Sequence, residues 1–197
     1  MAGGQMTVIG LTGGPGTGKS LAARYLADKG AIILSGDQAG KRAVEEYPAV
    51  LRSLEKTFGN AILNTDGTLN RRMMGRIAFS DPEAHQKLNE IVHPRLLKIL
   101  KSDLKKAKSK LIVIDAALIF EWGVADWCDY ILVVIARRDI RLKRLKSQGL
   151  SRREAEDRIG SQIPDREKAA LADYVIENNG TKASLKKNID RFVKLLP

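Results

Sequence analysis

The sequence predicts an α/β protein in which a parallel β-sheet lies between two layers of helices. Short apolar runs rich in β-forming residues recur along the chain, and segments with helical spacing separate them. Two of these runs, residues 110–115 and 129–136, are continuously apolar, which is typical of strands buried on both faces of a parallel sheet. Strands that alternate with helices in this way indicate a three-layer core.

The N-terminal half begins with two predicted strands separated by a helix. The run "TVIGLT", residues 7–12, leads into a group of glycines, and helical spacing over 20–30 ends at Gly30. The second run, "AIILS" at 31–35, is predicted to be a buried strand beside the first. Helical patterns then fill most of 38–110, around the turn-rich segment "GNAILNTDGTLN". This stretch is too long for a simple crossover, so we expect an inserted helical subdomain.

The C-terminal half supplies the remaining strands and a basic helical region. The two continuous apolar runs are followed by residues 137–170, a helical stretch rich in arginine and lysine. A short last strand with a turn, "DYVIENNG" at 173–180, precedes an amphipathic helix over 183–196. These elements complete the alternation of strands and helices.

The composition fits a globular protein with anionic partners. The chain has 197 residues and a formal net charge of +11, which favours phosphorylated small molecules or nucleic acid as ligands. A basic surface that only aids solubility has the same composition. Cys128 is the single cysteine, which excludes an intramolecular disulfide and fits a reducing cytoplasm. No apolar stretch is long enough to cross a bilayer and the N-terminus lacks a signal-peptide pattern, so we expect a cytoplasmic location without a membrane partner.

Residues 13–20, "GGPGTGKS", match the phosphate-binding pattern G-x-x-x-x-G-K-[ST] of a P-loop. A predicted strand runs into this segment and a predicted helix runs out of it. Gly13 and Gly18 allow backbone angles that leave N–H groups pointing inward, where the positive end of the helix also favours phosphate. Lys19 would reach the β- and γ-phosphates, and the Ser20 hydroxyl would bind Mg²⁺. The predicted ATP-binding residues are Gly13, Gly14, Pro15, Gly16, Thr17, Gly18, Lys19 and Ser20.

GTPases, motor ATPases and small-molecule kinases share the P-loop, so other features have to separate them. GTPases also carry an N-K-x-D motif that reads the base, and the sequence lacks it. Motor ATPases carry a run of acids where this chain has a single acid, Asp115, which can hold Mg²⁺ through water. A short chain with a helical insert and a late arginine-rich segment favours a kinase that closes over two substrates and excludes water.

A lone acid, Asp37, follows the second predicted strand. Because ligands bind at the carboxyl ends of strands in open α/β sheets, this carboxylate could orient an acceptor hydroxyl and accept its proton. An acid here also suits the N-cap of the helix predicted to begin at Gln38. The sequence leaves both roles open.

Arg137, Arg141 and Arg144 are spaced to share one face of a predicted helix. Arginine suits planar, multidentate binding of phosphate, and an arginine from a closing segment can stabilise charge on the transferring group. A solvated basic surface is an equal alternative for Arg137 and Arg141.

Several stretches together resemble the dephospho-coenzyme A kinase family. They follow in order through nearly the whole chain: "GLTGGPGTGKS", the segment around Asp37, "DGTLNRRMMGRIAFSDPEAHQKLNEIVHP", "LIFE", "RLKR", Gln162 and "ADYVIENNG". The middle stretch, which ends in His93 and Pro94, and the late D-x-V-I-x-N-N-G pattern are more specific than a P-loop. The resemblance implies transfer of the ATP γ-phosphate, with Mg²⁺, to the ribose 3′-hydroxyl of dephospho-coenzyme A.

The resemblance also implies roles for single residues. Asp37 would be the catalytic base and would contact the substrate, Lys19 would hold ATP, and Arg144 matches a lid arginine that meets phosphates. Arg71 and His93 lie in the stretch similar to the acceptor-binding region, although His93 could equally hold a helix end. The implied fold is a P-loop core like that of nucleoside monophosphate kinases over about 5–37, 108–137 and 170–197, an acceptor-binding insert over 38–107, and a lid over 138–169.

The chain departs from the family pattern at a few positions. Where the family has D-A-D this chain has Ser35-Gly36-Asp37, so the first acid is absent. Ala117 replaces a proline, Gln148 stands where the family often has a second lid arginine, and Leu21 replaces the common threonine.

Other hypotheses remain open. Another P-loop kinase, for a nucleoside monophosphate or another small alcohol, would have no reason to carry the His93-Pro94 and Asn-Asn-Gly stretches together. A non-catalytic nucleotide- or nucleic-acid-binding protein would explain the charge, but the sequence lacks an aromatic RNA-binding motif, so no nucleic-acid partner is expected. Ser35 and Gln148 would also suit a catalytically weakened scaffold.

Overall fold

The computed structural model describes residues 6–197 of the chain, apart from the side chain of Phe79. The backbone divides into two compact units. One is formed by the described residues up to Ser35 together with Lys106–Pro197, and the other is Gly36–Lys105. Residue 5, the predicted start of the core, lies outside the described residues. Within the described part, no helix combines the length and apolar character that crossing a bilayer requires.

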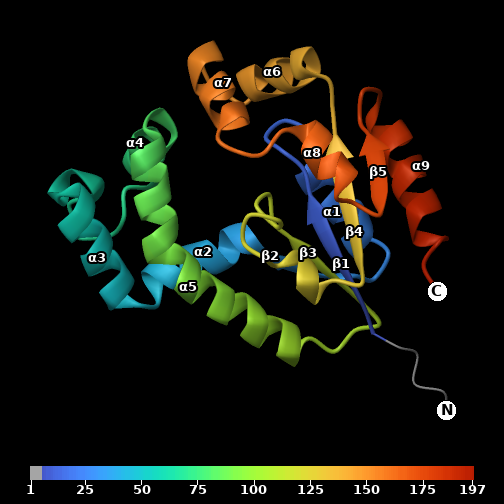
Figure 1. Ribbon diagram of the computed structural model, residues 1–197, viewed down its shortest axis with the longest axis horizontal. Coiled ribbons are helices and arrows are strands. Elements are labelled where there is room, and N and C mark those ends of the chain that lie inside the picture. Colours follow the sequence, from blue (N-terminus) through green and yellow to red (C-terminus); the bar gives the residue numbers. More distant parts are fainter. Residues whose placement is uncertain (1–5) are drawn as a thin grey trace. The chain divides into compact units, whose positions relative to one another are not determined.

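The first unit is built on a parallel five-stranded sheet in the order β2-β3-β1-β4-β5 (Figure 1). The central strands β1, β3 and β4 are buried along most of their length, as the continuous apolar runs of β3 and β4 predicted for those two strands. This arrangement confirms the predicted α/β class with a parallel sheet. The strands are β1 (Thr7–Thr12), β2 (Ile32–Ser35), β3 (Leu111–Asp115), β4 (Tyr130–Ile135) and β5 (Tyr174–Glu177).

The second strand does not lie where the sequence predicted it. β3 pairs with both β1 and β2, so β2 is an edge strand and not the neighbour of β1. Its residues are partly exposed, and Ile32 keeps 36% of its surface accessible. The apolar run at 31–35 indicates that these residues form a strand, but it contains no information about the order of the strands in the sheet. The register aligns Ser35 with Asp115, so β2 and β3 end side by side.

Helices α1 (Lys19–Ala27) and α9 (Lys182–Val193) pack against one face of the sheet. The other face lies against the loop after β3 and the short helix α8 (Asp165–Ala170). A side chain at Gly10 would collide with Ile119 and Ile131 on this face, so the loop and the sheet are in close contact. The core on the α1–α9 face is formed by Ile9, Leu11, Ala22, Ala23, Leu26, Ala31, Val113, Leu132, Val134, Ile176, Leu185, Ile189 and Phe192.

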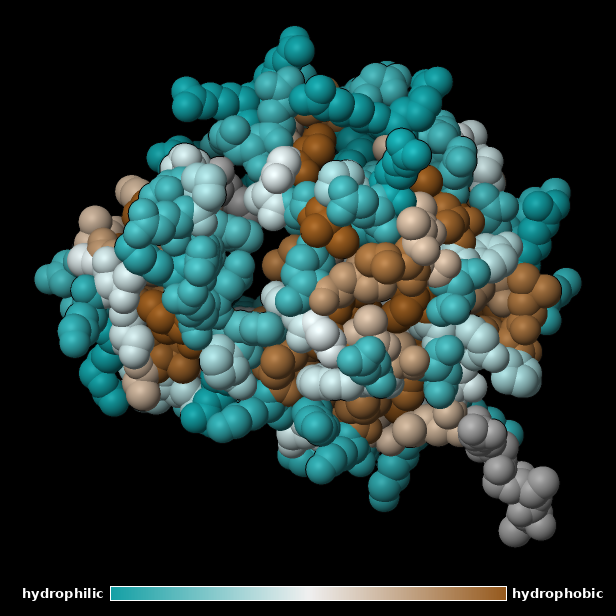
Figure 2. Space-filling model, in the orientation of Figure 1, coloured by the Kyte–Doolittle hydropathy of each residue, from teal (hydrophilic) through white to brown (hydrophobic). Residues whose placement is uncertain are grey.

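The basic region after β4 forms α6 (Arg138–Ser147), α7 (Arg152–Gly160) and α8. A capping box begins α7, since Ser151 and Glu154 accept each other's backbone N–H groups. The surface over α6 and α7 is mostly hydrophilic (Figure 2). By their contacts these helices belong to the first unit. Their role as a lid stays a prediction.

The second unit is helical and has its own apolar core. Its helices are α2 (Gly36–Glu45), α3 (Pro48–Phe58), α4 (Arg71–Ser80) and α5 (Pro82–Lys106), with the 3₁₀ turn η1 (Asn60–Ile62). Their apolar faces meet at Val44, Val50, Leu54, Ile62, Met74 and Ala78. The unit covers nearly the same residues as the predicted insert, and its binding of the acceptor stays a prediction.

Candidate active site

The loop between β1 and α1 has the backbone of a phosphate cradle. Gly13, Gly16 and Gly18 have φ angles of 150°, 78° and 99°, which residues with a side chain rarely adopt. At Gly13 and Gly16 a Cβ atom would also collide with backbone atoms of neighbouring segments. α1 begins at Lys19 without a side chain that caps its first N–H groups. These groups and the helix dipole are therefore available to an anion.

Lys19 and Asp115 form an ion pair beside this loop. The Lys19 Nζ donates to Asp115 Oδ1 at the carboxyl end of β3, and each side chain is only 12% exposed. The opposite charges compensate each other's loss of solvent. Ser20 follows in the first turn of α1, and its side chain is exposed. The structure thus brings the predicted ammonium and carboxylate together, and Ser20, which carries the predicted hydroxyl, follows Lys19 in the chain.

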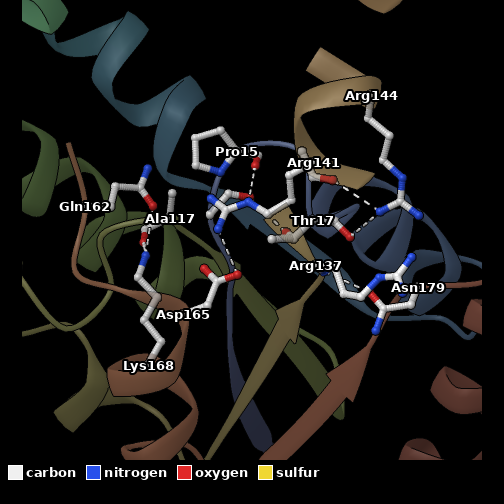
Figure 3. Close-up of polar contacts among 12 residues, drawn as sticks. Pro15, Thr17, Ala117, Arg137, Arg141, Arg144, Gln162, Asp165, Lys168 and Asn179 are labelled. Carbon is white, nitrogen blue, oxygen red and sulfur yellow. Dashed lines mark hydrogen bonds and ion pairs between the residues drawn. The ribbon is translucent and has the colours of Figure 1, made fainter. Parts of the chain in front are cut away.

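Arg141 is buried against the P-loop, which contradicts the solvated interpretation. Its exposed fraction is 6%. The Nε donates to the carbonyl oxygen of Pro15 at 2.8 Å, and Nη1 donates to Asp165 Oδ2 at 2.9 Å (Figure 3). Burial lowers the pKa of the guanidinium, and the charge of Asp165 opposes this shift. Arg137 is instead exposed beside Asp139, as expected of a solvated residue.

Arg144 binds three backbone carbonyls around the same loop. Its Nη1 donates to Gly16 and Thr17 at 3.2 and 3.1 Å, and its Nη2 donates to Asn178 at 2.9 Å. In a trans peptide the carbonyl and the following N–H point in opposite directions. Because Arg141 and Arg144 hold the carbonyls of Pro15 and Thr17, the next N–H groups point away from the arginines. The arginines therefore fix the outer side of the loop, and contact of Arg144 with phosphate stays a prediction.

Asn178 is a site residue that the sequence indicated only through the family resemblance. It is 5% exposed and follows β5 directly. Its Nδ2 donates to the carbonyl oxygen of Thr17 at 2.8 Å, and its backbone N–H donates to Ile135 at 2.8 Å. The available indication was an amide side chain at the carboxyl edge of a parallel strand, where ligands bind. Asp165 had no such indication, because it lies in a short charged helix that resembles a solvated surface.

Asp37 lies in the second unit, in the first turn of α2. The helix begins at Gly36, so Asp37 is inside it and the predicted N-cap role is wrong. The carboxylate is exposed in the first turn of this helix. Covalent geometry keeps it two residues beyond Ser35, whose backbone aligns with Asp115.

Arg71 and His93 lie on other helices of the second unit. α4 begins after Asn70, whose side chain accepts a backbone hydrogen bond of 3.0 Å, and this places Arg71 in its first turn. The guanidinium is exposed and lies 3.4 Å from Glu45 Oε1. His93 lies inside α5, so it does not hold a helix end. It is half-buried, and burial lowers its pKa.

The donors beside Lys19 fit a magnesium ion bound to a nucleotide. Among residues 6–197, no group of three or more histidine, cysteine or acidic side chains could hold a metal by itself. Mg²⁺ in nucleotide sites takes one or two protein ligands and completes its shell with phosphates and water. The Ser20 hydroxyl and the Asp115 carboxylate match that donor set. Cys128 takes no part, because burial raises the pKa of its thiol to about 12.

Comparison with known proteins indicates one family. The family model for dephospho-CoA kinase matches residues 7–184. The dephospho-CoA kinase of Fusobacterium nucleatum is 38% identical over 190 residues, which are 96% of this chain and 98% of that protein. A solved protein of Thermus thermophilus is 31% identical, with a TM-score of 0.81 over 98% of this chain and 99% of that one. The dephospho-CoA kinase structure from Campylobacter jejuni is 25% identical, with a TM-score of 0.66 over 95% of each chain.

Proposed function

We propose that this chain, which belongs to the dephospho-CoA kinase family, transfers the γ-phosphate of ATP to the ribose 3′-hydroxyl of dephospho-CoA. The products are coenzyme A and ADP, in the last step of coenzyme A biosynthesis. The observation that carries the proposal is the P-loop itself, whose carbonyl groups are held from outside by Arg141 and Arg144 beside the Lys19–Asp115 pair. We also propose a cytoplasmic location, where ATP is available and the lone Cys128 stays reduced.

The P-loop would bind the phosphates of ATP through its inward N–H groups and the start of α1. Lys19 would exchange its bond with Asp115 for bonds to the β- and γ-phosphate oxygens. This exchange costs little, because the ammonium leaves one oxygen anion for another. Pre-formed donors need no reorganisation when charge moves during the transfer, which is where electrostatic catalysis gains most. Arg144 would add a positive charge close to the same phosphates.

Ser20 and Asp115 would hold Mg²⁺, Ser20 directly and Asp115 through water. When bound, the ion neutralises negative charge on the phosphates. Release of Asp115 from Lys19 would leave its carboxylate free to accept hydrogen bonds from water. The pair in the structure is therefore a resting arrangement that supports both roles.

Asp37 would orient the acceptor hydroxyl and accept its proton as the phosphate is transferred. Ser35 occupies the place of the family's first acid, so Asp37 supplies the only carboxylate of the Ser35-Gly36-Asp37 segment. Arg71 and His93, on helices of the second unit, would contact the acceptor. Closure of residues 138–169 as a lid would keep water from the γ-phosphate.

The experiment is release of ADP from Mg·ATP with dephospho-CoA, AMP or a short RNA as acceptor. We expect that only dephospho-CoA stimulates ADP release strongly, and that mass spectrometry finds one added phosphate on its ribose. The Lys19→Met variant, prepared in parallel, excludes a contaminating kinase. Strong stimulation by AMP and none by dephospho-CoA would overturn the proposal. ATP binding without turnover on any acceptor would instead indicate a non-catalytic protein.

A further inference from the structure

Lys168 is the largest fully buried side chain of the first unit, although lysine is almost always exposed. Its exposed fraction is 0%. The Nζ donates to the carbonyl oxygen of Ala117 at 2.6 Å and to Gln162 Oε1 at 2.8 Å (Figure 3). A methionine would fill such a position without the cost of burying a charge. The ammonium is therefore expected to serve something other than stability.

The segment that Lys168 binds carries Asp115. Ala117 comes two residues after Asp115, and its carbonyl oxygen also accepts the Thr12 hydroxyl at 3.1 Å. Thr12 ends β1 and directly precedes the P-loop. The Ala117 carbonyl, just after β3, therefore accepts one hydrogen bond from Thr12 at the end of β1 and one from Lys168 in α8.

A second contact joins the same two segments. The backbone N–H of Ile163, just before α8, donates to Glu121 Oε1 at 3.3 Å. Glu121 belongs to the loop after β3 that also contains Ala117. The loop after Asp115 is therefore held by the approach to α8 as well as by Lys168.

The other end of α8 binds the P-loop through Arg141. Asp165 is the first residue of α8, and its carboxylate accepts from Arg141, which also donates to the Pro15 carbonyl. Asp165 and Lys168 are three residues apart, so they share one face of the helix. Both side chains of this face are mostly or fully buried. A short helix therefore contacts the P-loop side at one end and the Asp115 side at the other.

Charges around Lys168 come from each of these elements. Burial lowers its pKa, the charges of Glu121 and Asp165 raise it, and those of Arg141 and Lys19 lower it further. The positive charges of Lys19 and Arg141 therefore act on the Lys168 ammonium. The ammonium in turn adds its own positive charge to the electrostatic potential at the phosphate site.

We infer that Lys168 is a positioning residue and that α8 acts as a brace between the P-loop and the loop after Asp115. The brace keeps the P-loop and the segment that carries Asp115 in fixed positions relative to each other, also when Lys19 leaves Asp115 for the phosphates. The inference rests on the proposed kinase function of this site. It predicts that loss of Lys168 slows phosphate transfer and weakens nucleotide binding. Binding of the acceptor should not change.

The test is Lys168→Met, with Lys187→Met on the exposed surface of α9 as the matched control. We expect kcat to fall about 10–100-fold, as for loss of groups that orient a catalytic site. The Kd for MgATP, measured by calorimetry, should rise severalfold, while KM for dephospho-CoA stays within about twofold. Lys187→Met should match the wild type. A Lys168→Met protein with lower Tm but unchanged kcat and MgATP affinity would overturn the inference.

Asp165→Asn tests whether α8 acts as one unit. If either end of the brace is needed, the double variant with Lys168→Met should be scarcely slower than the slower single variant. Effects on kcat that multiply would mean independent anchors and would contradict the brace. If Lys168→Met is insoluble, Gln162→Met replaces it, because this variant removes one acceptor of the Lys168 ammonium. Its kcat and its Kd for MgATP then test the inference in the same way. If the wild type fails to phosphorylate dephospho-CoA, the proposed function falls, whereas the MgATP affinities still test the brace.

Discussion

The two units of the chain use polar side chains in opposite ways. Around the P-loop the polar contacts are buried, and the Arg141–Asp165 pair keeps only 7% and 19% of its side-chain surface exposed. In the helical unit the ion pairs lie on the surface, as with Lys87 and Glu83 at 50% and 74%. Apolar residues form the core of the helical unit. Buried ion pairs restrict geometry, whereas exposed pairs contribute little to stability.

This difference fits the roles proposed for the two units, which are nucleotide binding for the first and acceptor binding for the second. Phosphate binding needs backbone N–H groups that already point inward, and the buried contacts of Arg141, Arg144 and Asn178 supply that constraint. The helical unit carries Asp37 and Arg71 on its surface, where we expect the second substrate to reach them. We therefore expect substitutions near the P-loop to affect nucleotide binding and turnover together. Each substitution in the helical unit should instead change mainly one property, which is catalysis, acceptor binding or stability.

The largest effect is expected at Asp37, although it is exposed and contributes little to the fold. Asp37→Asn removes the proposed general base while it keeps the shape of the side chain, so kcat should fall about 10²–10⁴-fold. MgATP affinity should stay close to that of the wild type. Asp139→Asn is the matched control, because Asp139 also lies in the first turn of a helix, α6. If kcat of Asp37→Asn stays within a few-fold of the wild type, Asp37 is not the base and has only a structural role in α2.

Replacement of Arg144 by methionine should have the next largest effect. Three carbonyls each lose one donor, so the inward N–H groups are less well fixed and kcat/KM for MgATP should fall about 10–100-fold. Arg144→Lys should restore little, because one ammonium cannot reproduce the planar set of donors. Arg138→Met, on the exposed start of the same helix, is the control. Full recovery by Arg144→Lys would mean that a point charge near the phosphates is what matters.

Asn178→Ala should change stability more than chemistry. The buried carbonyl of Thr17 loses one of its two side-chain donors, which costs about 1–2 kcal/mol in the free energy of unfolding. For a chain of this length that corresponds to a fall in Tm of roughly 2–8 °C. Asn179→Ala, next in sequence but exposed, should cost less than about 0.5 kcal/mol. Calorimetric unfolding of both variants measures the difference, and equal costs would contradict the role of burial.

The smallest effect is a pH dependence of stability from the helical unit. Burial lowers the pKa of His85 and of His93 below 6.5, so the folded state binds their protons less readily than the unfolded state. Their contribution to stability is present above pH 6.5 and is lost as the pH falls through the folded-state pKa values. Urea unfolding between about pH 7 and 5 should show this decrease, and it should be weaker in the double variant His85→Gln, His93→Gln. An unchanged pH slope in that variant would assign the effect to other groups.

Local sequence was most informative where a motif constrains the backbone directly. The glycine spacing of residues 13–20 predicted the loop, and positive φ angles occur at Gly13 and Gly18 as expected. The apolar runs at β3 and β4 predicted buried parallel strands, because burial on both faces requires continuous apolar residues. The same reasoning failed at β2, where only the pairing partner decides between an edge and a central place.

Helix-face spacing was less informative for the charged residues. The spacing put Arg137, Arg141 and Arg144 on one face, but only the fold shows that Arg141 meets the P-loop and that Arg137 meets solvent. For Lys168 the sequence offered no indication, because a charged residue in a short helix is normally exposed.

By itself the sequence determined the P-loop, the alternation of strands and helices, and the family of this protein. These follow from residue type and spacing, which act over one turn or one strand. The tertiary structure alone decided the strand order, the burial of Arg141 and Lys168, and the contact of Asn178 with the P-loop. Each of these depends on which distant segment packs opposite a residue, and no local pattern records that partner.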